Sequence, residues 1–378
     1  MWGIIVSSFL TKKRNTKSFE EELSTKPIQT QRNIQYAVKL FEDFISYKYS
    51  EKTVEQVTGE LKRLKKEEEQ QTYEEALYGM LQDWIVWNAE SGRSSYTIKV
   101  AFSNLRKYLF HLGIKTNEQD IKAYLSFNKR THEERYPLSQ DEYRKIVNGF
   151  GRNPRLQALF LALGSSGMRI GEALGLKKKD LDFSKSRIKV NIPANTKTRR
   201  GRSTYLSIET EKILKPILES LGSEDLIFSQ KSTRLSDRSI RTSLNRILDR
   251  IGFVEKYQSN KFRKITSHSF RAYFFTKSAR KHGENYAHRM TGHGGYLMQY
   301  DRMTEEEKLE MYIELEPELT IFDQTKNEME IERLKKENQT IDELRQQVNE
   351  LRKFQARQDK KILDDFREKG NLPTGDEK

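Results

Sequence analysis

Cationic, imidazole and phenol side chains recur in short motifs along the second half of the chain. Arg169 follows a glycine and opens a helical stretch, and a guanidinium can bind two phosphate oxygens at once. His268 and Arg271 stand three residues apart, so they share a face on a helix. His293 lies between glycines, and Tyr300 follows it closely. Side chains of these types could bind a phosphodiester and attack it with a phenol oxygen.

A basic turn lies between two short stretches, residues 187–192 and 203–207, whose alternating or β-branched side chains predict a β-hairpin. The cations in and beside this turn are Lys197, Arg199, Arg200 and Arg202. Cations at a turn can reach into a groove of DNA, so the turn is a candidate for nucleic-acid contact.

Each motif alone also has an ordinary structural explanation. Arg169 could be a surface arginine paired with Glu172, and the basic turn could be a solvated loop. His268 could be buried against a carbonyl group, and Tyr300 could pack in a core, as most tyrosines do. The functional interpretation depends on the whole set and on its order along the chain.

That order resembles the tyrosine recombinase (phage integrase) family. The stretches SSGMRIGEALGL, SHSFRAYF and RMTGH resemble its first arginine motif, its second arginine motif and its third motif. The resemblance is strong over residues 139–300 and looser over residues 31–125, which look like the helical core-binding domain of these enzymes. The stretch YDRMTEEEKLEMYIELEPELTI looks similar to archaeal plasmid and virus integrases in particular.

The resemblance implies a site-specific recombinase that cleaves and rejoins DNA strands through a 3′-phosphotyrosine, with no ATP, metal or other cofactor. Carried over residue by residue, it implies that Arg169 and Arg271 bind the scissile phosphate. Lys197 would be the general acid on the leaving 5′ oxygen. His268 and His293 would assist proton transfer and donate hydrogen bonds to the phosphate.

The resemblance also implies that Tyr300 is the nucleophile, with one departure from the family pattern. In most members the tyrosine lies nine residues after the histidine of the third motif, and that position here is Arg302. Tyr300 lies seven residues after His293, so Tyr296 and Tyr312 are alternative candidates. Tyr300 is preferred because Tyr-x-Arg before a Thr-Glu-Glu run resembles the archaeal forms.

Composition restricts the classes of protein and of site. The 378 residues carry a formal net charge of +14, which favours a polyanionic partner, double-stranded DNA first and an anionic membrane surface second. The sequence contains 0 cysteines, which excludes disulfides, thiolate zinc sites and cysteine nucleophiles. Residues 4–10 are apolar but too few to span a bilayer. We therefore expect no membrane partner and a cytoplasmic protein of a prokaryotic cell, or one encoded by a virus or plasmid.

The hydrophobic periodicity predicts a mostly α fold with a small antiparallel β-sheet. A basic helix over 94–113 carries the candidate DNA contacts Lys99, Arg106 and Lys107. The predicted organisation is a flexible N-terminal segment over 1–30, a helical DNA-binding (core-binding) domain over 31–125, a linker over 126–138, a catalytic domain over 139–322, a coiled coil or long helix over 323–368 and a disordered tail over 369–378.

A heptad pattern marks the C-terminal segment. Leu334, Ile341, Val348 and Ile362 recur at multiples of seven, Leu344 and Leu351 follow two of them by three, and Gln355 is the weak point. We expect coiled-coil self-association, in keeping with the homo-tetramer on paired DNA sites that the family resemblance implies. Recruitment of another partner, or packing back onto the catalytic domain, are the alternatives.

Two other functions share these motifs. A type IB topoisomerase uses similar chemistry to relax DNA as a monomer, and the C-terminal heptads weigh against it because they favour assembly. A catalytically silent DNA-binding structural protein of the same fold is favoured only by the displaced position of Tyr300.

Overall fold

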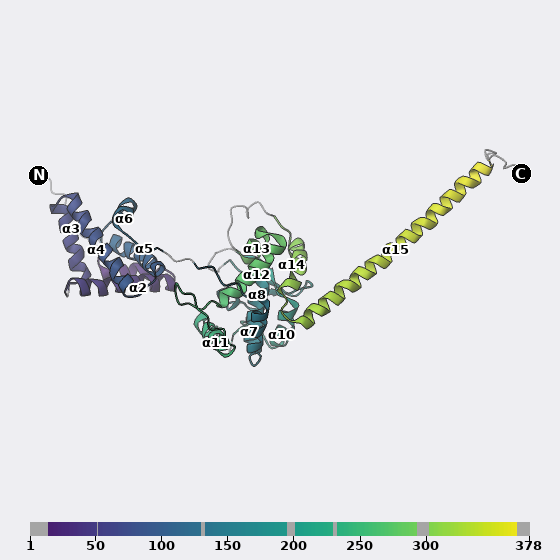
Figure 1. The fold of residues 1–378 in the computed structure, drawn as a ribbon, viewed down its shortest axis with the longest axis horizontal. Helices are drawn as coiled ribbons and strands as arrows, with labels where there is room; N and C mark the ends of the chain where they lie inside the picture. Colours follow the sequence, from purple (N-terminus) through teal and green to yellow (C-terminus); the bar gives the residue numbers. More distant parts are fainter. Residues whose placement is uncertain are drawn as a thin grey trace. The chain divides into compact units, whose positions relative to one another are not determined.

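The computed structural model describes residues 14–50, 52–129, 133–194, 201–229, 233–292 and 302–368 (Figure 1). Its contacts divide the chain into two compact units, Met1–Glu134 with Tyr257–Lys261, and Arg135–Lys256 with Phe262–Lys378. The division after Glu134 falls within the predicted linker. The predicted fold class, mostly α with a small antiparallel sheet, is confirmed.

The first unit is a helical bundle. Its helices are α1 (Thr16–Leu23), α2 (Ile28–Lys48), α3 (Val54–Glu67), α4 (Gln70–Glu90), α5 (Ser95–His111) and α6 (Glu118–Tyr124). Each of α2, α4 and α5 presents one apolar face to a shared core, in which Trp84 and Tyr108 are fully buried. This packing leaves the polar face of α5 toward solvent.

The prediction of a flexible segment over 1–30 is wrong for its second half. Helix α1 begins with a capping box in which the Asn15 side chain accepts a hydrogen bond from the Ser18 backbone N–H. Phe19 and Leu23 are buried, and the Phe19 ring lies 5.0 Å from that of Tyr108. Two apolar residues are too few to give a periodic pattern, so only the tertiary contact reveals this helix.

The second unit is built around α8 (Pro154–Ser166). Residues 158–166 are all buried, as expected for a helix that is apolar on every side. Helices α10 and α12 pack against it. The other elements of this unit are α7 (Gln140–Gly149), α9 (Ile170–Ala173), the 3-10 helix η1 (Lys178–Asp180), α10 (Ile208–Glu219), α11 (Asp237–Arg250), α12 (Ser267–His282), α13 (Glu284–Thr291) and α14 (Glu305–Leu319).

The predicted hairpin forms the sheet. Strands β2 (Lys189–Ile192) and β3 (Arg202–Tyr205) pair antiparallel, with Val190 opposite Thr204. Strand β1 (Leu181–Asp182) adds to the free edge of β2 and was not predicted, because two residues carry no periodic signal. The tip of the hairpin, residues 195–200, lies outside the described residues.

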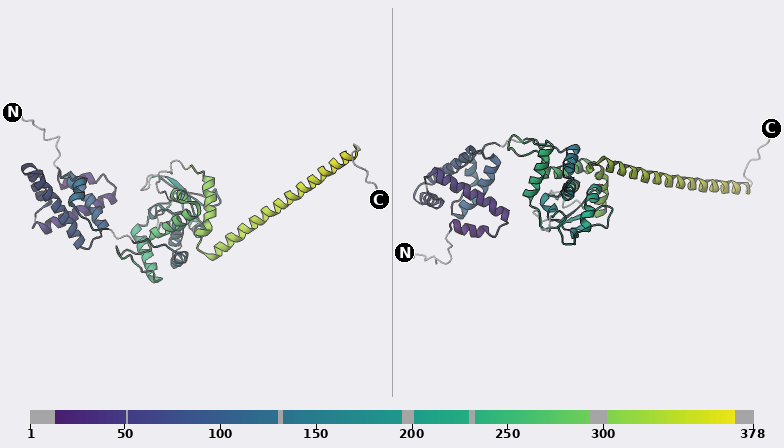
Figure 2. Two further views of the ribbon diagram at one scale, coloured as in Figure 1. Left: turned by 45° about the horizontal axis from the view of Figure 1, so that its top comes forward. Right: turned by 90° about the horizontal axis from the view of Figure 1, so that it is seen from below.

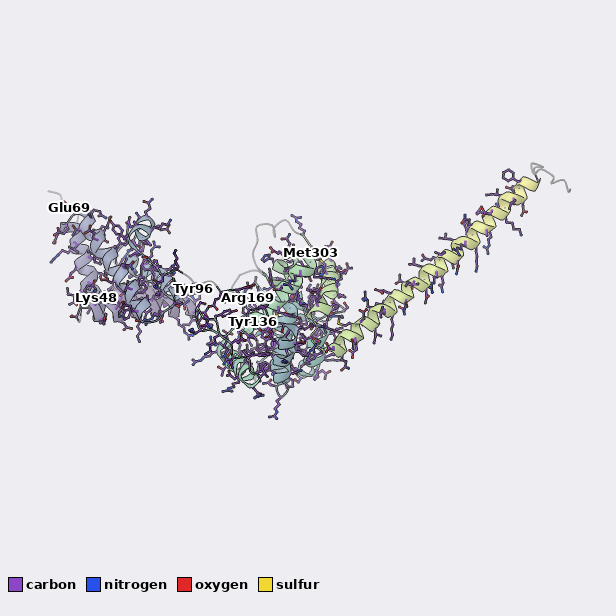
Figure 3. The ribbon with its side chains drawn as sticks, viewed as in Figure 1. Lys48, Glu69, Tyr96, Tyr136, Arg169 and Met303 are labelled. Atoms are coloured by element: carbon purple, nitrogen blue, oxygen red, sulfur yellow. The ribbon has the colours of Figure 1, made fainter. Side chains whose placement is uncertain are left out.

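Helix α15 (Asp323–Glu368) occupies the segment predicted to be a coiled coil or a long helix. It is a single uninterrupted helix in both views of Figure 2. Residues 330–366 are all exposed, and Figure 3 shows their side chains extending from every side of the helix. None of the helices within the described ranges is both long and apolar enough to cross a membrane. The predicted disordered tail over 369–378 lies outside those ranges.

Candidate active site

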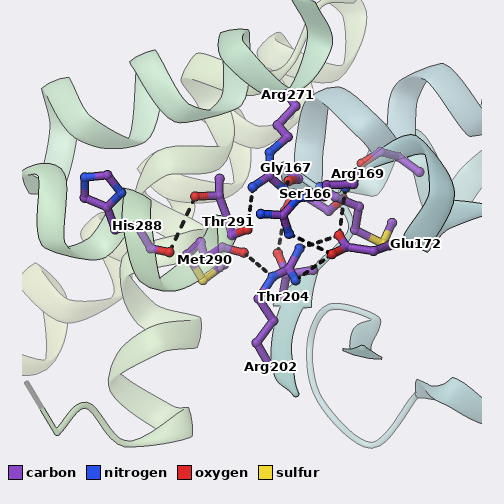
Figure 4. A network of polar contacts seen from close by, with 12 residues as sticks. Ser166, Gly167, Arg169, Glu172, Arg202, Thr204, Arg271, His288, Met290 and Thr291 are labelled. Atoms are coloured by element: carbon purple, nitrogen blue, oxygen red, sulfur yellow. Dashed lines mark hydrogen bonds and ion pairs between the residues drawn. The ribbon is translucent and has the colours of Figure 1, made fainter. Parts of the chain in front are cut away.

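Two arginines from distant motifs meet at the C-terminal end of α8. Arg169 is the N-cap residue of α9, and Arg271 lies in the second turn of α12 (Figure 4). The Arg271 guanidinium donates to the carbonyl oxygen of Gly167 and, over 2.6 Å, to that of Thr291. Arg271 therefore ties the first arginine motif to the third, and the segments implied to form one site do come together.

Glu172 holds Arg169 in place. Its carboxylate accepts a 2.8 Å hydrogen bond from the Arg169 backbone N–H and a 2.9 Å bond from Arg169 Nη1. The same carboxylate receives two bonds from Arg202, of 2.6 Å to Oε2 and 3.1 Å to Oε1. Burial alone would raise the pKa of Glu172, but the bonds and charge of Arg202, then those of Arg169, lower that pKa to about 2. The carboxylate stays ionised at every ordinary pH.

Arg202 is buried beside Glu172, with only 8% of its side chain exposed. Its Nε also donates over 3.1 Å to the carbonyl oxygen of Met290, near the end of α13. The sequence placed Arg202 among candidate DNA contacts, whereas the structure gives its guanidinium an internal role. The sequence offered the Arg169–Glu172 pair as the ordinary structural alternative for Arg169. It did not reveal the second cation, because Arg202 lies thirty residues from Glu172.

Arg271 is the most buried cation of this site, with 2% of the residue exposed. Burial first, and then the positive charges of Arg169 and Arg202, lower the pKa of Arg271 to about 9. The guanidinium is still charged at neutral pH. A cation held in a poorly solvated place by fixed carbonyl groups is suited to stabilise an anion without rearranging.

His268 lies one turn before Arg271 on α12 and is exposed. The surrounding protein nevertheless shields the imidazole ring from part of the solvent, and this desolvation is the largest cause that lowers the pKa of His268 below its usual value. The positive charges of Arg271, Arg135 and Arg169 lower that pKa further. The imidazole is therefore neutral near pH 7 and able to accept a proton. Arg135 is a cation that sequence reasoning missed, because it lies within the predicted linker.

Glycines permit the close approach of these segments. Gly167 ends α8 with φ +64°, and a Cβ there would lie 2.4 Å from the Phe274 ring. Gly292 ends α13 with φ +66°, and a Cβ there would lie 2.8 Å from Cδ of Arg202. The backbone at Gly292, one of the glycines beside His293, thus approaches the Arg202 side chain closely.

Gly292→Ala should destabilise the protein more than Gly252→Ala. Both glycines have positive φ, +66° and +82°, but a Cβ on Gly252 meets nothing within 4 Å. We expect about 1–2 kcal/mol of backbone strain for Gly252→Ala, and about 1–3 kcal/mol more for Gly292→Ala from the clash with Arg202. Urea unfolding of the two variants measures the difference. Equal losses would contradict the packing of Arg202 on Gly292.

Several predicted site residues lie outside the described ranges: Lys197, Arg199, Arg200, His293, Tyr296 and Tyr300. The segments that flank them are joined through contacts of β2, β3 and α14. Ser203 Oγ and Lys189 Nζ contact the Glu305 carboxylate at 3.0 Å and 2.9 Å. Lys308 Nζ donates to Ser203 Oγ over 2.7 Å. The ends of the hairpin that carries Lys197 and the start of the helix that follows Tyr300 are thereby held together.

Tyr312, one of the alternative nucleophiles, is fully buried within α14. Its hydroxyl donates over 2.8 Å to the carbonyl oxygen of Ser165, at the end of α8. Burial first, and then the charge of Glu316, raise the pKa of Tyr312 well above its usual value. The phenol serves to pack α14 against α8, and DNA could not reach it without unfolding that contact.

A polar groove of about 900 Å³ opens beside Arg169, and its lining includes the carboxylates of Glu172, Asp180 and Asp237. Lys177, Lys179 and Arg234 line it, and Arg234 Nη2 donates over 2.7 Å to the carbonyl oxygen of Gly171. Sequence reasoning did not single out these three cations, because none lies in a recognisable motif.

The predicted DNA-contacting side chains of α5 lie on its polar face. Lys99 and Lys107 are exposed, and Arg106 is half-buried. The Lys99 ammonium lies 5.6 Å from the centre of the Phe127 ring, while Arg106 Nε donates over 3.0 Å to Thr116. Arg106 and Lys107 line a cleft of about 920 Å³, which lies in the first unit.

The family model and the individual relatives that match this chain agree with one another. The Phage integrase family matches residues 136–294. Tyrosine recombinase XerC of Thermodesulfovibrio yellowstonii is 26% identical over 204 residues, which are 50% of this chain and 65% of that protein. A probable integrase/recombinase of Acholeplasma phage L2 is 26% identical over 187 residues, 48% of this chain and 62% of that protein. The chain thus spans slightly less than two thirds of either relative.

Solved structures show the same fold. The lambda integrase(75–356) dimer bound to a COC′ core site is similar with a TM-score of 0.53 and 17% identity, over 76% of this chain and 97% of that one. The lambda integrase tetramer bound to a Holliday junction gives the same TM-score of 0.53 and 17% identity, over 76% and 78% of the two chains. The family match includes Arg169, His268 and Arg271. Of these, Arg169 and Arg271 lie together at the end of α8 (Figure 4). Residues 136–294 are thus similar to the phage integrase family, and the relatives that match the chain are a tyrosine recombinase and a probable integrase/recombinase.

Proposed function

We propose that this protein is a site-specific DNA recombinase that cleaves and rejoins strands through a 3′-phosphotyrosine on Tyr300. The observation that carries the proposal is the convergence of Arg169 and Arg271, each fixed by its own internal partners. Two guanidiniums held in this way provide positive charge where a phosphodiester transition state gathers negative charge. We propose that the protein acts in the cytoplasm of a prokaryotic cell, because the DNA that it would cleave lies there.

The proposed reaction exchanges one phosphodiester for another. The Tyr300 oxygen attacks the scissile phosphorus, and the bond from phosphorus to the 5′ oxygen breaks. Lys197 gives a proton to the leaving 5′ oxygen, while His268 and His293 assist the transfer of the phenol proton and hydrogen-bond the phosphate. A phenol with a pKa of about 10 is mostly protonated at neutral pH. To act as a nucleophile, the phenol must lose its proton. The neutral imidazole of His268 can accept a proton, and the cations around it favour the phenolate.

The proposed DNA surface combines predicted and newly identified cations. Lys99, Arg106 and Lys107 of the first unit, and Arg199 and Arg200 of the hairpin, remain proposed contacts. We assign Arg202 to the positioning of Glu172 instead, because its guanidinium is buried against that carboxylate. Lys177, Lys179 and Arg234 join the proposed surface, since they line the groove beside Arg169.

Affinity for duplex DNA should fall steeply with salt. If six to ten phosphates are contacted, raising monovalent salt from 50 to 200 mM should weaken binding by roughly 10³–10⁵-fold, because counterions are released on binding. Fluorescence anisotropy of a labelled duplex measures the slope. An affinity that does not change with salt would contradict a phosphate-dominated interface.

A nicked duplex tests the chemistry. The nick lets the short strand with its 5′ hydroxyl diffuse away after cleavage, so the covalent intermediate accumulates. A pool of nicked duplexes with a randomised core makes knowledge of the target site unnecessary. We expect a protein–DNA adduct that survives denaturation, with DNA attached by its 3′ phosphate.

The same assay separates the alternatives. A silent DNA-binding protein would bind the pool and form no adduct under any condition. A type IB topoisomerase would form the adduct and would also relax a supercoiled plasmid that lacks the selected sites, as a monomer. We propose a homo-tetramer on paired sites with α15 joining copies of the chain, so relaxation of a site-free plasmid should not occur.

A further inference from the structure

The exposed part of α15 carries an apolar stripe with no partner among the described residues. Its apolar side chains are each about half-exposed or more: Ile331, Leu334, Ile341, Leu344, Val348, Leu351, Phe354, Ile362, Leu363 and Phe366. A helix that packs against nothing is marginal in water, because most helical stability comes from burying such a stripe. We therefore expect another part of a protein to cover this apolar stripe.

We propose that α15 pairs with α15 of a second copy as a parallel, in-register, two-stranded coiled coil. Its central layers are Ile341, Leu344, Val348 and Leu351. This inference specifies the self-association proposed above and rests on that proposal.

The identity of the core residues favours two strands. In heptad notation Ile341 and Val348 occupy a positions, and Leu344 and Leu351 occupy d positions. β-branched residues at a combined with leucine at d favour parallel dimers over trimers and tetramers. Gln355 and Gln358 occupy the next a and d positions. A polar core position is best satisfied by its own copy, so these glutamines favour the in-register pairing.

The residues that flank the core favour the parallel orientation. Arg345 and Arg352 occupy e positions, and Thr340 and Gln347 occupy g positions. In a parallel pair Arg345 faces the partner's Thr340, and Arg352 faces the partner's Gln347. In an antiparallel pair that overlaps the four central layers, Arg345 would face the partner's Arg345. Like charges in that arrangement repel, so the antiparallel pair is disfavoured.

The charges of α15 argue against DNA as its occupant. The helix contains 11 lysines and arginines and 12 aspartates and glutamates, whereas the whole chain has a net charge of +14. Several of these charges pair along the helix itself, as Arg333 does with Glu330 at 2.7 Å and with Glu337 at 3.1 Å. The apolar stripe has a heptad order that is complementary to itself.

The first turns of α15 are attached to the catalytic unit. The buried Glu209 carboxylate accepts hydrogen bonds from the backbone N–H groups of Ile321, over 3.0 Å, and Phe322, over 2.7 Å. Arg144 pairs with Asp323 at 2.8 Å, and Lys212 pairs with Glu328 at 2.7 Å. Because both helices of a parallel coil start at the same end, the pairing would hold two catalytic units side by side at that end.

The oligomeric state of the full chain without DNA tests the pairing. Sedimentation velocity should show a dimer, and Leu344→Asp with Leu351→Asp should weaken it on the order of 100-fold or more, because charges replace two core layers. The matched control is Gln339→Asp with Gln346→Asp, which adds the same charge at outward f positions. It should stay dimeric. A monomer at every concentration, a trimer, or equal behaviour of the two double variants would overturn the proposal.

A single cysteine tests the orientation, because the chain contains 0 cysteines. Leu334→Cys should form an intermolecular disulfide under mild oxidation, since the two thiols of a parallel pair meet. In the antiparallel overlap each thiol would lie roughly 36 Å from its copy, at 1.5 Å rise per residue. Gln346→Cys, at an f position, should not cross-link. Absence of the Leu334→Cys disulfide in a dimeric protein would overturn the parallel orientation.

The adduct assay keeps this proposal separate from the proposed function. Leu344→Asp with Leu351→Asp should still form the covalent adduct on a nicked single site, because neither residue touches the site. An adduct from a chain that never dimerises would overturn the coiled coil alone. Dimerisation without any adduct would overturn the recombinase chemistry alone.

Discussion

Tyr300→Phe should abolish the covalent DNA adduct and lower strand cleavage on the order of 10⁴-fold or more, because the variant has no oxygen with which to attack the phosphate. DNA binding should change little, since the phenol hydroxyl is a small part of a large ionic interface. The measurement is the yield of adduct on the nicked pool, followed by mass spectrometry of the peptide attached to DNA.

Two other tyrosines serve as controls. Tyr312→Phe should keep the adduct and lower stability by about 1 kcal/mol, because it removes the hydrogen bond to the Ser165 carbonyl oxygen. Tyr296→Phe should also keep the adduct. Recovery of the adduct from Tyr300→Phe protein, or on a peptide that contains Tyr296 or Tyr312, would remove Tyr300 from the role.

Glu172→Ala should destabilise the protein strongly. Removing this carboxylate leaves Arg202, of which only 8% of the side chain is exposed, without its counter-charge. Breaking one partner of a buried ion pair costs about 3–5 kcal/mol. Arg169 also loses the bonds that orient it, so cleavage should fall on the order of 10²-fold even below the unfolding transition.

A second glutamate provides a matched control for Glu172. Glu224 also pairs with two cations, Lys177 at 2.9 Å and Lys179 at 2.7 Å, but 62% of its side chain is exposed. Glu224→Ala should leave the denaturant midpoint nearly unchanged, because solvent screens exposed pairs. Glu172→Gln should retain part of the hydrogen bonding and recover part of the cleavage activity. Equal losses of stability for Glu172→Ala and Glu224→Ala would mean that the site does not depend on the buried carboxylate.

Some of the structural features behind these predictions can be predicted from the sequence, and others cannot. The fold class, the hairpin and the three motifs are predictable, because periodicity, turn composition and short-range spacing are local properties of the chain. That Arg169 and Arg271 lie close together was implied only by the family resemblance. It could not be derived from the residues themselves, because no local rule brings α9 and α12 together. Helix α1 was missed because two apolar residues give no period, although they bury fully once α5 is present.

The sequence by itself determined the types of the cations, histidines and tyrosines in the three motifs, and an order along the chain that resembles the tyrosine recombinase family. Tertiary structure alone decided the surroundings of those that lie in the described part of the chain. It buried Tyr312 against Ser165, made Arg202 an internal partner of Glu172, and brought Arg234 to the groove beside Arg169. Burial and ion pairing depend on contacts between residues far apart in the chain, and a side chain's reach, charge and solvent exposure follow from those contacts.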